Sequence, residues 1–147
     1  MPDPIIVKGE VWEEQNPTFC WRATGANGAV LVQADLSTGT GSAGTGVDIR
    51  VYDISANEQT AVTNPTTAIY SLLGQAASAY VFNSLQTDGY WNADSDGYNV
   101  RVTIDCSQSG LVIEGGHKYR ASVRLNTTAW GPVFLVGEWL AKPIWST

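Results

Sequence analysis

The stretch Lys-Tyr-Arg-Ala-Ser-Val-Arg-Leu-Asn, residues 118–126, alternates between apolar and polar side chains. Successive side chains of a β-strand point to opposite faces, so Tyr119 and every second residue after it would share one face. Arg120, Ser122 and Arg124 would share the other. A strand that is buried on one face and solvated on the other fits this pattern, as in an antiparallel sheet.

Seven further segments predict strands, because they alternate in the same way or form short apolar stretches bounded by Gly, Asn, Asp or Pro. They are residues 5–11, 18–24, 30–36, 47–53, 79–84, 98–105 and 132–141. About eight short strands separated by turns indicate an all-β fold. We expect an antiparallel β-sandwich of immunoglobulin-like or jelly-roll-like type.

Residues 65–79 do not follow the strand pattern. Their apolar side chains recur at helical spacing from Ala68 to Ala76, and Pro65 suits the first turn of a helix. Gly74 disfavours a helix at this point. The segment predicts one short helix in a crossover between two strands.

The length and charge of the chain limit its organisation and its partners. Its 147 residues fit one domain, 1–147, with an extended N-terminal arm at 1–4 and a C-terminal tail at 142–147. The net charge is −6, and the eight Lys and Arg residues are scattered, which argues against nucleic acid or an anionic membrane as partner. No secretory signal precedes the first strand, so we expect synthesis in a cytoplasm.

Two cysteines, Cys20 and Cys106, lie far apart in the chain. A disulfide between two sheets is one reading, as in immunoglobulin domains. Free thiols are favoured, because the expected compartment is reducing.

Residues 37–46 contain only small side chains and predict a mobile connection with nothing to anchor it. Within them, residues 39–44 match the dinucleotide pattern G-x-G-x-x-G. That motif requires a helix at its end, and an alternating strand follows here, so no cofactor is expected.

Asn92, Asp94, Asp96 and Gly97 match the first half of a calcium-binding loop. The twelfth position, which would need a carboxylate, holds Thr103. A tight turn explains the pattern better, and a weak Ca²⁺ site is the alternative.

His117 is the only histidine, so any catalytic triad or imidazole-based metal site would depend on it. It follows two glycines at the start of a predicted strand. We expect a structural or surface role for His117, no catalytic residue and no enzyme activity.

Six tryptophans and six tyrosines are the strongest compositional signal. Exposed aromatic side chains in loops and termini are candidates for partner contacts. Trp130 follows a polar turn, and Ile144 and Trp145 lie in the C-terminal tail, so these three are the predicted interface residues. The alternative is a glycan-stacking surface formed by Tyr90, Trp91 and Trp130.

Residues 80–101 contain a Leu-Gln-Thr stretch, then Trp, Asp and Gly-Tyr-Asn leading into a strand; residues 115–120 read Gly-Gly-His-Lys-Tyr-Arg. These motifs resemble small β-sandwich structural proteins of tailed bacteriophages, over roughly residues 80–140.

The resemblance implies a virion protein without enzyme activity. The first expectation is a capsid decoration or cement protein that binds the major capsid protein or neighbouring copies, as a homo-oligomer such as a trimer. The alternatives are a carbohydrate-binding or receptor-binding module of a tail fibre, and a head–tail or tail assembly protein.

Overall fold

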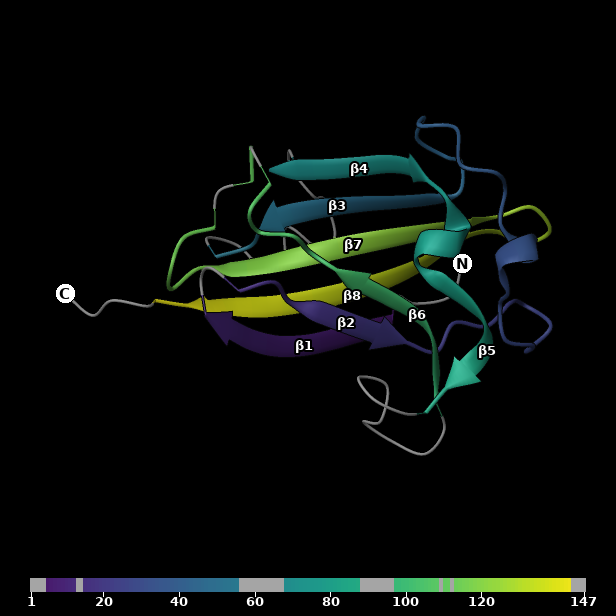
Figure 1. The fold of residues 1–147 in the computed structure, drawn as a ribbon, viewed down its shortest axis with the longest axis horizontal. Helices are drawn as coiled ribbons and strands as arrows, with labels where there is room; N and C mark the ends of the chain where they lie inside the picture. Colours follow the sequence, from purple (N-terminus) through teal and green to yellow (C-terminus); the bar gives the residue numbers. More distant parts are fainter. Residues whose placement is uncertain are drawn as a thin grey trace.

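The computed structural model describes residues 5–12, 15–55, 68–87, 97–108, 110, 111 and 113–143, with the backbone alone for 5–9. Two β-sheets pack face to face, and only two short 3-10 turns accompany them in the described chain (Figure 1). The strands are β1 (Ile5–Trp12), β2 (Thr18–Trp21), β3 (Val47–Asp53), β4 (Tyr70–Gln75), β5 (Val81–Gln86), β6 (Tyr98–Thr103), β7 (Lys118–Thr127) and β8 (Gly131–Lys142). The 3-10 turns are η1 (Gln33–Asp35) and η2 (Ala77–Ala79).

The strand order is that of an immunoglobulin-like sandwich, which confirms the predicted fold class. One sheet has the order β1-β8-β7-β3-β4 and the other β2-β6-β5. Taken along the chain from β2, these are the positions of immunoglobulin strands B, C, C′, D, E, F and G. The first strand departs from an all-antiparallel arrangement, because β1 pairs with β8 in parallel.

All but one of the predicted strands are present, and the exception is residues 30–36. This segment forms η1 between two isolated bridges, Thr24–Val30 and Leu36–Thr127. The Asp35 carboxylate accepts a hydrogen bond from the Val32 N–H at 2.9 Å. A local side-chain partner of this kind competes with a sheet ladder, so the alternating pattern does not become a strand.

The predicted helix at 65–79 is wrong over its described part, which forms β4 and η2. Gly74 has a φ of 63°, a left-handed conformation that an α-helix does not contain. Its N–H donates to the carboxylate of Asp48 at 2.8 Å, which holds this part of β4 beside β3. The apolar residues at helical spacing instead contribute to an edge strand.

The core lies between the two sheets and is centred on four aromatic rings. Phe19 and Trp21 of β2 face Tyr119 of β7 and Trp139 of β8, with ring centroids 5.4–5.9 Å apart in the contacting pairs. All four side chains are buried. The indole N–H of Trp21 donates to the carbonyl of Val136 at 3.2 Å, which satisfies its polar atom inside the core.

The connection before β7 has the tyrosine corner of immunoglobulin-like sandwiches. The Tyr119 hydroxyl accepts a hydrogen bond from the backbone N–H of Glu114 at 2.8 Å. No inter-sheet disulfide accompanies it, because Cys20 and Cys106 are free thiols. Burial, and then the nearby Asp105, raise the pKa of the Cys106 thiol to about 11, so it stays protonated at neutral pH.

The glycine-rich tract at 37–46 is anchored, against expectation. The Asp48 carboxylate, which is 1% exposed, accepts hydrogen bonds from the Gly44 and Gly74 N–H groups. Arg124 and Asn126 of β7 donate to the same carboxylate. One buried carboxylate therefore joins the tract, β4 and β7. Although burial alone would raise the pKa of Asp48, these hydrogen bonds hold it below its ordinary value.

Arg120 was predicted to face solvent, yet it is 3% exposed on the outer side of the five-stranded sheet. It pairs with Glu138 at 2.9 Å, and both side chains are buried. The Nε and Nη1 atoms of Arg120 have no hydrogen-bond partner. The ion pair thus leaves two buried donors unsatisfied, which costs stability.

Asp48→Asn should destabilise the fold by roughly 3 kcal/mol, because the amide keeps one acceptor and places a donor against groups that themselves donate. Urea unfolding followed by tryptophan fluorescence measures this. Asp105→Asn, the same change in an exposed surface turn, should cost much less stability.

The Asp48 contribution has a defined pH dependence. Because the folded pKa is lowered, the contribution is present above the ordinary value near 3.8 and is lost as the pH falls through the folded value. The stabilities of the parent and Asp48→Asn proteins should therefore converge in acid. A constant difference down to pH ~2 would contradict this assignment.

Candidate functional site

An exposed tryptophan marks one end of the five-stranded sheet. Trp12 is the last residue of β1, lies opposite Lys142 of β8, and is 46% exposed. Val11 packs against the core, so Glu10 and Trp12 face outward, since strand side chains alternate.

Lys142 holds the Trp12 ring in place. Its ammonium group lies 4.6 Å from the ring centroid and 3.9 Å from the Glu10 carboxylate. A cation over an exposed aromatic face contributes about 0.5–1 kcal/mol, and an exposed ion pair adds little, so this contact favours one position of the Trp12 ring. The result is a preorganised aromatic surface at the β1–β8 edge. This residue was not among the predicted interface residues.

A second exposed tryptophan, Trp130, lies in the turn between β7 and β8, as the sequence predicts for an interface residue. Its backbone N–H donates to the Thr127 hydroxyl, which itself donates to the Gly131 carbonyl. The ring packs on Gly25, where an added Cβ would lie 2.7 Å from it. One side of Trp130 is thus held, and the residue stays 36% exposed.

The two tryptophans lie at opposite ends of β8. Figure 1 shows β8 running between β1 and β7. β8 runs from Gly131, next to Trp130, to Lys142, beside Trp12. At about 3.3 Å per residue the strand separates these ends by roughly 36 Å. A partner that contacts only one end of β8 therefore does not cover the tryptophan at the other end.

The other predicted site residues lie in parts of the chain that the structure does not describe. Ile144 and Trp145 of the interface prediction, and Tyr90 and Trp91 of the glycan alternative, lie outside the described residues. So do all three candidate calcium ligands, which are Asn92, Asp94 and Asp96. The predicted tail at 142–147 begins one residue too early, because Lys142 still belongs to β8.

His117 lies at the surface between two carboxylates. Its Nδ1 is 2.8 Å from Asp53 and its Nε2 is 3.2 Å from Glu114. Ser55 donates to the other oxygen of Asp53. The carboxylate thus stands between the hydroxyl and the imidazole. A nucleophile relay needs the imidazole in that middle position, so these residues do not form a Ser-His-Asp triad.

The hydrogen bond that the imidazole donates to the Asp53 carboxylate raises the pKa of His117 above 6.5. Burial opposes this effect by a smaller amount, and the charges of Asp53 and Glu114 add to it. As the only histidine, it gives one set of imidazole signals in proton NMR. We expect these signals to titrate above pH 6.5, and Asp53→Asn to lower the midpoint. A midpoint at or below 6.5 in the parent protein would contradict the geometry.

The stabilising effect of His117 follows the same direction. Because the folded pKa is raised, the contribution is full below the unfolded value near 6.5 and disappears as the pH rises through the folded value. The stability difference between the parent and His117→Gln should therefore shrink from pH ~6 to pH ~8.

No protein-family model, curated protein or solved structure matches this chain. Within the described ranges, no group of three or more His, Cys, Asp and Glu side chains is arranged to hold a metal ion. None of the helical segments in those ranges has the length and apolar character needed to cross a membrane.

Proposed function

We propose that the chain is a non-enzymatic structural protein of a virus particle, a capsid decoration or cement protein that bridges neighbouring subunits. The observation that carries this proposal is the pair of exposed tryptophans at opposite ends of β8. Tryptophan is enriched among the residues that dominate binding energy at interfaces. A protein that joins two neighbours needs two separate contact surfaces of this kind.

The rigidity of the connection between the surfaces supports bridging. β8 pairs with β7 from Gly131 to Leu140 and with β1 from Leu135 to Lys142. Both tryptophans are also held by their surroundings, Trp12 by Lys142 and Trp130 by Gly25. Side chains that are already ordered lose less conformational entropy on binding, so more of the contact energy remains as binding free energy.

The resemblance to phage β-sandwich proteins is consistent with this role. The fold by itself does not assign a function, because sandwiches of this type have many functions. A head–tail or tail assembly protein would use the same two-ended design. The partner in each case is a neighbouring virion protein, either the major capsid protein or another copy of this chain.

The test is incorporation of the chain into capsid particles, measured as its occupancy in purified particles. Trp12→Ala and Trp130→Ala should each weaken binding by roughly 10–100-fold, the range typical of a central interface tryptophan. The double variant should be absent from purified particles. Unchanged occupancy of the double variant would rule out bridging through these ends.

Two further variants sharpen the experiment. Ile69→Ala removes a side chain that is 36% exposed, as Trp130 is, and should leave occupancy unchanged. Removal of residues 143–147 keeps β8 complete and tests the predicted contribution of Ile144 and Trp145. We expect this truncated protein to fold and to show reduced occupancy.

A further inference from the structure

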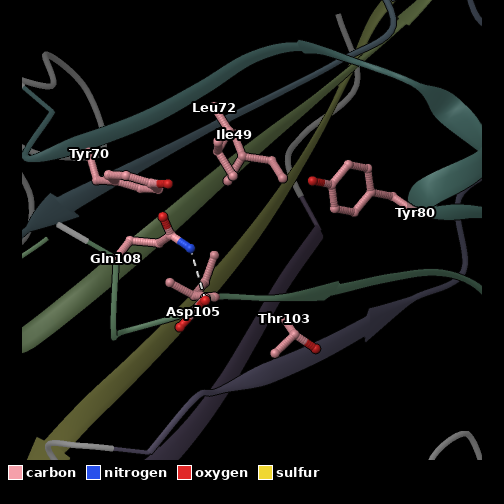
Figure 2. A pocket seen from close by; sticks show the side chains of 8 residues that line it. Ile49, Tyr70, Leu72, Tyr80, Thr103, Asp105 and Gln108 are labelled. Atoms are coloured by element: carbon pink, nitrogen blue, oxygen red, sulfur yellow. Dashed lines mark hydrogen bonds between the residues drawn. The ribbon is translucent and has the colours of Figure 1, made fainter. Parts of the chain in front are cut away.

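A cleft of about 270 Å³ opens between the two sheets. It lies between β4 at the edge of one sheet and the end of β6 in the other (Figure 2). Its lining residues come from β3, β4, the connection before β5, and the end of β6 with the turn that follows. They include Ile49, Tyr70, Leu72, Tyr80, Asp105 and Gln108.

The cleft exists because β5 leaves the second half of β6 uncovered. β5 pairs with β6 only between Tyr98 and Val100. On the edge of β6 that faces β5, the last backbone hydrogen bond is the one that the Arg101 N–H donates to the carbonyl of Tyr80. The Ile104 N–H donates to Pro17 on the other side of β6, so the Thr103 N–H faces the cleft, since N–H groups alternate along a strand.

Hydroxyl groups point into the cleft from both sides. Figure 2 shows the phenol oxygens of Tyr70 and Tyr80 directed toward each other, with Ile49 and Leu72 between them. Burial, and then Tyr70, raise the pKa of Tyr80, so its hydroxyl keeps its proton and can donate a hydrogen bond.

The turn after β6 supplies acceptors. The Gln108 amide nitrogen donates to the Asp105 carboxylate at 2.9 Å, and its carbonyl oxygen lies on the side of Tyr70 (Figure 2). The hydrogen bonds from Ser107 and Gln108 hold the pKa of Asp105 below its ordinary value. The carboxylate is therefore ionised at neutral pH, and its bonds to the turn fix its position.

The geometry points to a neutral saccharide of one or two rings as the ligand of this cleft. The partly exposed Leu72, with the buried Ile49 beneath it, forms an apolar base for the C–H face of a sugar ring. The two phenols, the Gln108 carbonyl and the Asp105 carboxylate surround it with donors and acceptors for its hydroxyl groups. The volume is slightly below the range of drug-sized sites, which suits a ligand of this size.

Other ligand classes fit less well. A phosphate or carboxylate ligand would meet the Asp105 charge in a chain of net charge −6. A quaternary ammonium ion needs aromatic faces around it, and here the hydroxyl edges of the rings converge. This site shares no residue with the glycan-stacking surface expected at Tyr90, Trp91 and Trp130, and it does not depend on the proposed structural role.

The test uses the full-length, ¹⁵N-labelled protein and a panel of neutral sugars: glucose, galactose, mannose, N-acetylglucosamine, lactose and maltose. At least one should cause saturable amide shifts at residues 70–72, 79–81 and 103–108, with a Kd on the order of 1 mM. Tyr70→Phe and Tyr80→Phe remove one hydroxyl each and should raise that Kd roughly fivefold each. Tyr52→Phe, the same change on the neighbouring strand β3 outside the cleft lining, should not alter it.

Several results of this titration would contradict the saccharide proposal. Absence of shifts with every sugar up to about 100 mM overturns the proposal, as do shifts confined to other residues. Choline chloride serves as the cationic counter-probe, and saturable choline binding in the cleft without sugar binding also overturns it. Sugar binding that survives in the Tyr70→Phe/Tyr80→Phe double variant would show that the hydroxyls do not recognise the ligand. None of these results bears on incorporation into particles.

Discussion

The contact between the Phe19 ring and the bare backbone of Gly137 determines how closely the two sheets approach. A Cβ at position 137 would lie 2.6 Å from the ring, so only glycine permits this packing. The same ring contacts Trp21 and Trp139, each with a centroid separation of 5.9 Å. Aromatic pairs of this type contribute about 0.5–1.5 kcal/mol beyond the area they bury. The cluster thus joins β2 to β8 in a sandwich whose two cysteines remain free thiols.

This central packing also explains why the candidate binding surfaces are peripheral and separate. The aromatic cluster covers the inner face of β8. The first residue of the strand, Gly131, follows Trp130, and its last residue, Lys142, lies opposite Trp12. The cleft lies at the opposite edge, where β4 and the uncovered part of β6 leave the sandwich open. The three surfaces share no residue.

Most strands could be predicted because period-two alternation reports burial on one face directly. The failures have local causes. Residues 30–36 alternate as a strand does, but the Asp35 carboxylate takes the Val32 N–H, and Gly74 adopts a left-handed conformation inside an apparently helical pattern. Hydrophobic spacing carries no information on either effect.

The candidate sites were less accessible to prediction than the fold. Trp130 could be identified because it follows a polar turn, whereas the exposure of Trp12 depends on which face of β1 meets the core. The cleft combines side chains from four separated parts of the chain and results from the short pairing of β5 with β6. No motif or spacing encodes that arrangement.

The parallel pairing of β1 with β8 has a consequence for how the protein is made. β1 contains the first described residues of the chain and β8 the last strand, and their ladder joins segments at opposite ends of the sequence. A ribosome synthesises the chain from its N-terminus, so β1 emerges long before its partner exists. Contacts of such high sequence separation form late and slowly. Until β8 has been translated, β1 lacks its only strand partner in the described sheet, and this is the interval in which a chaperone or a neighbouring chain can capture it.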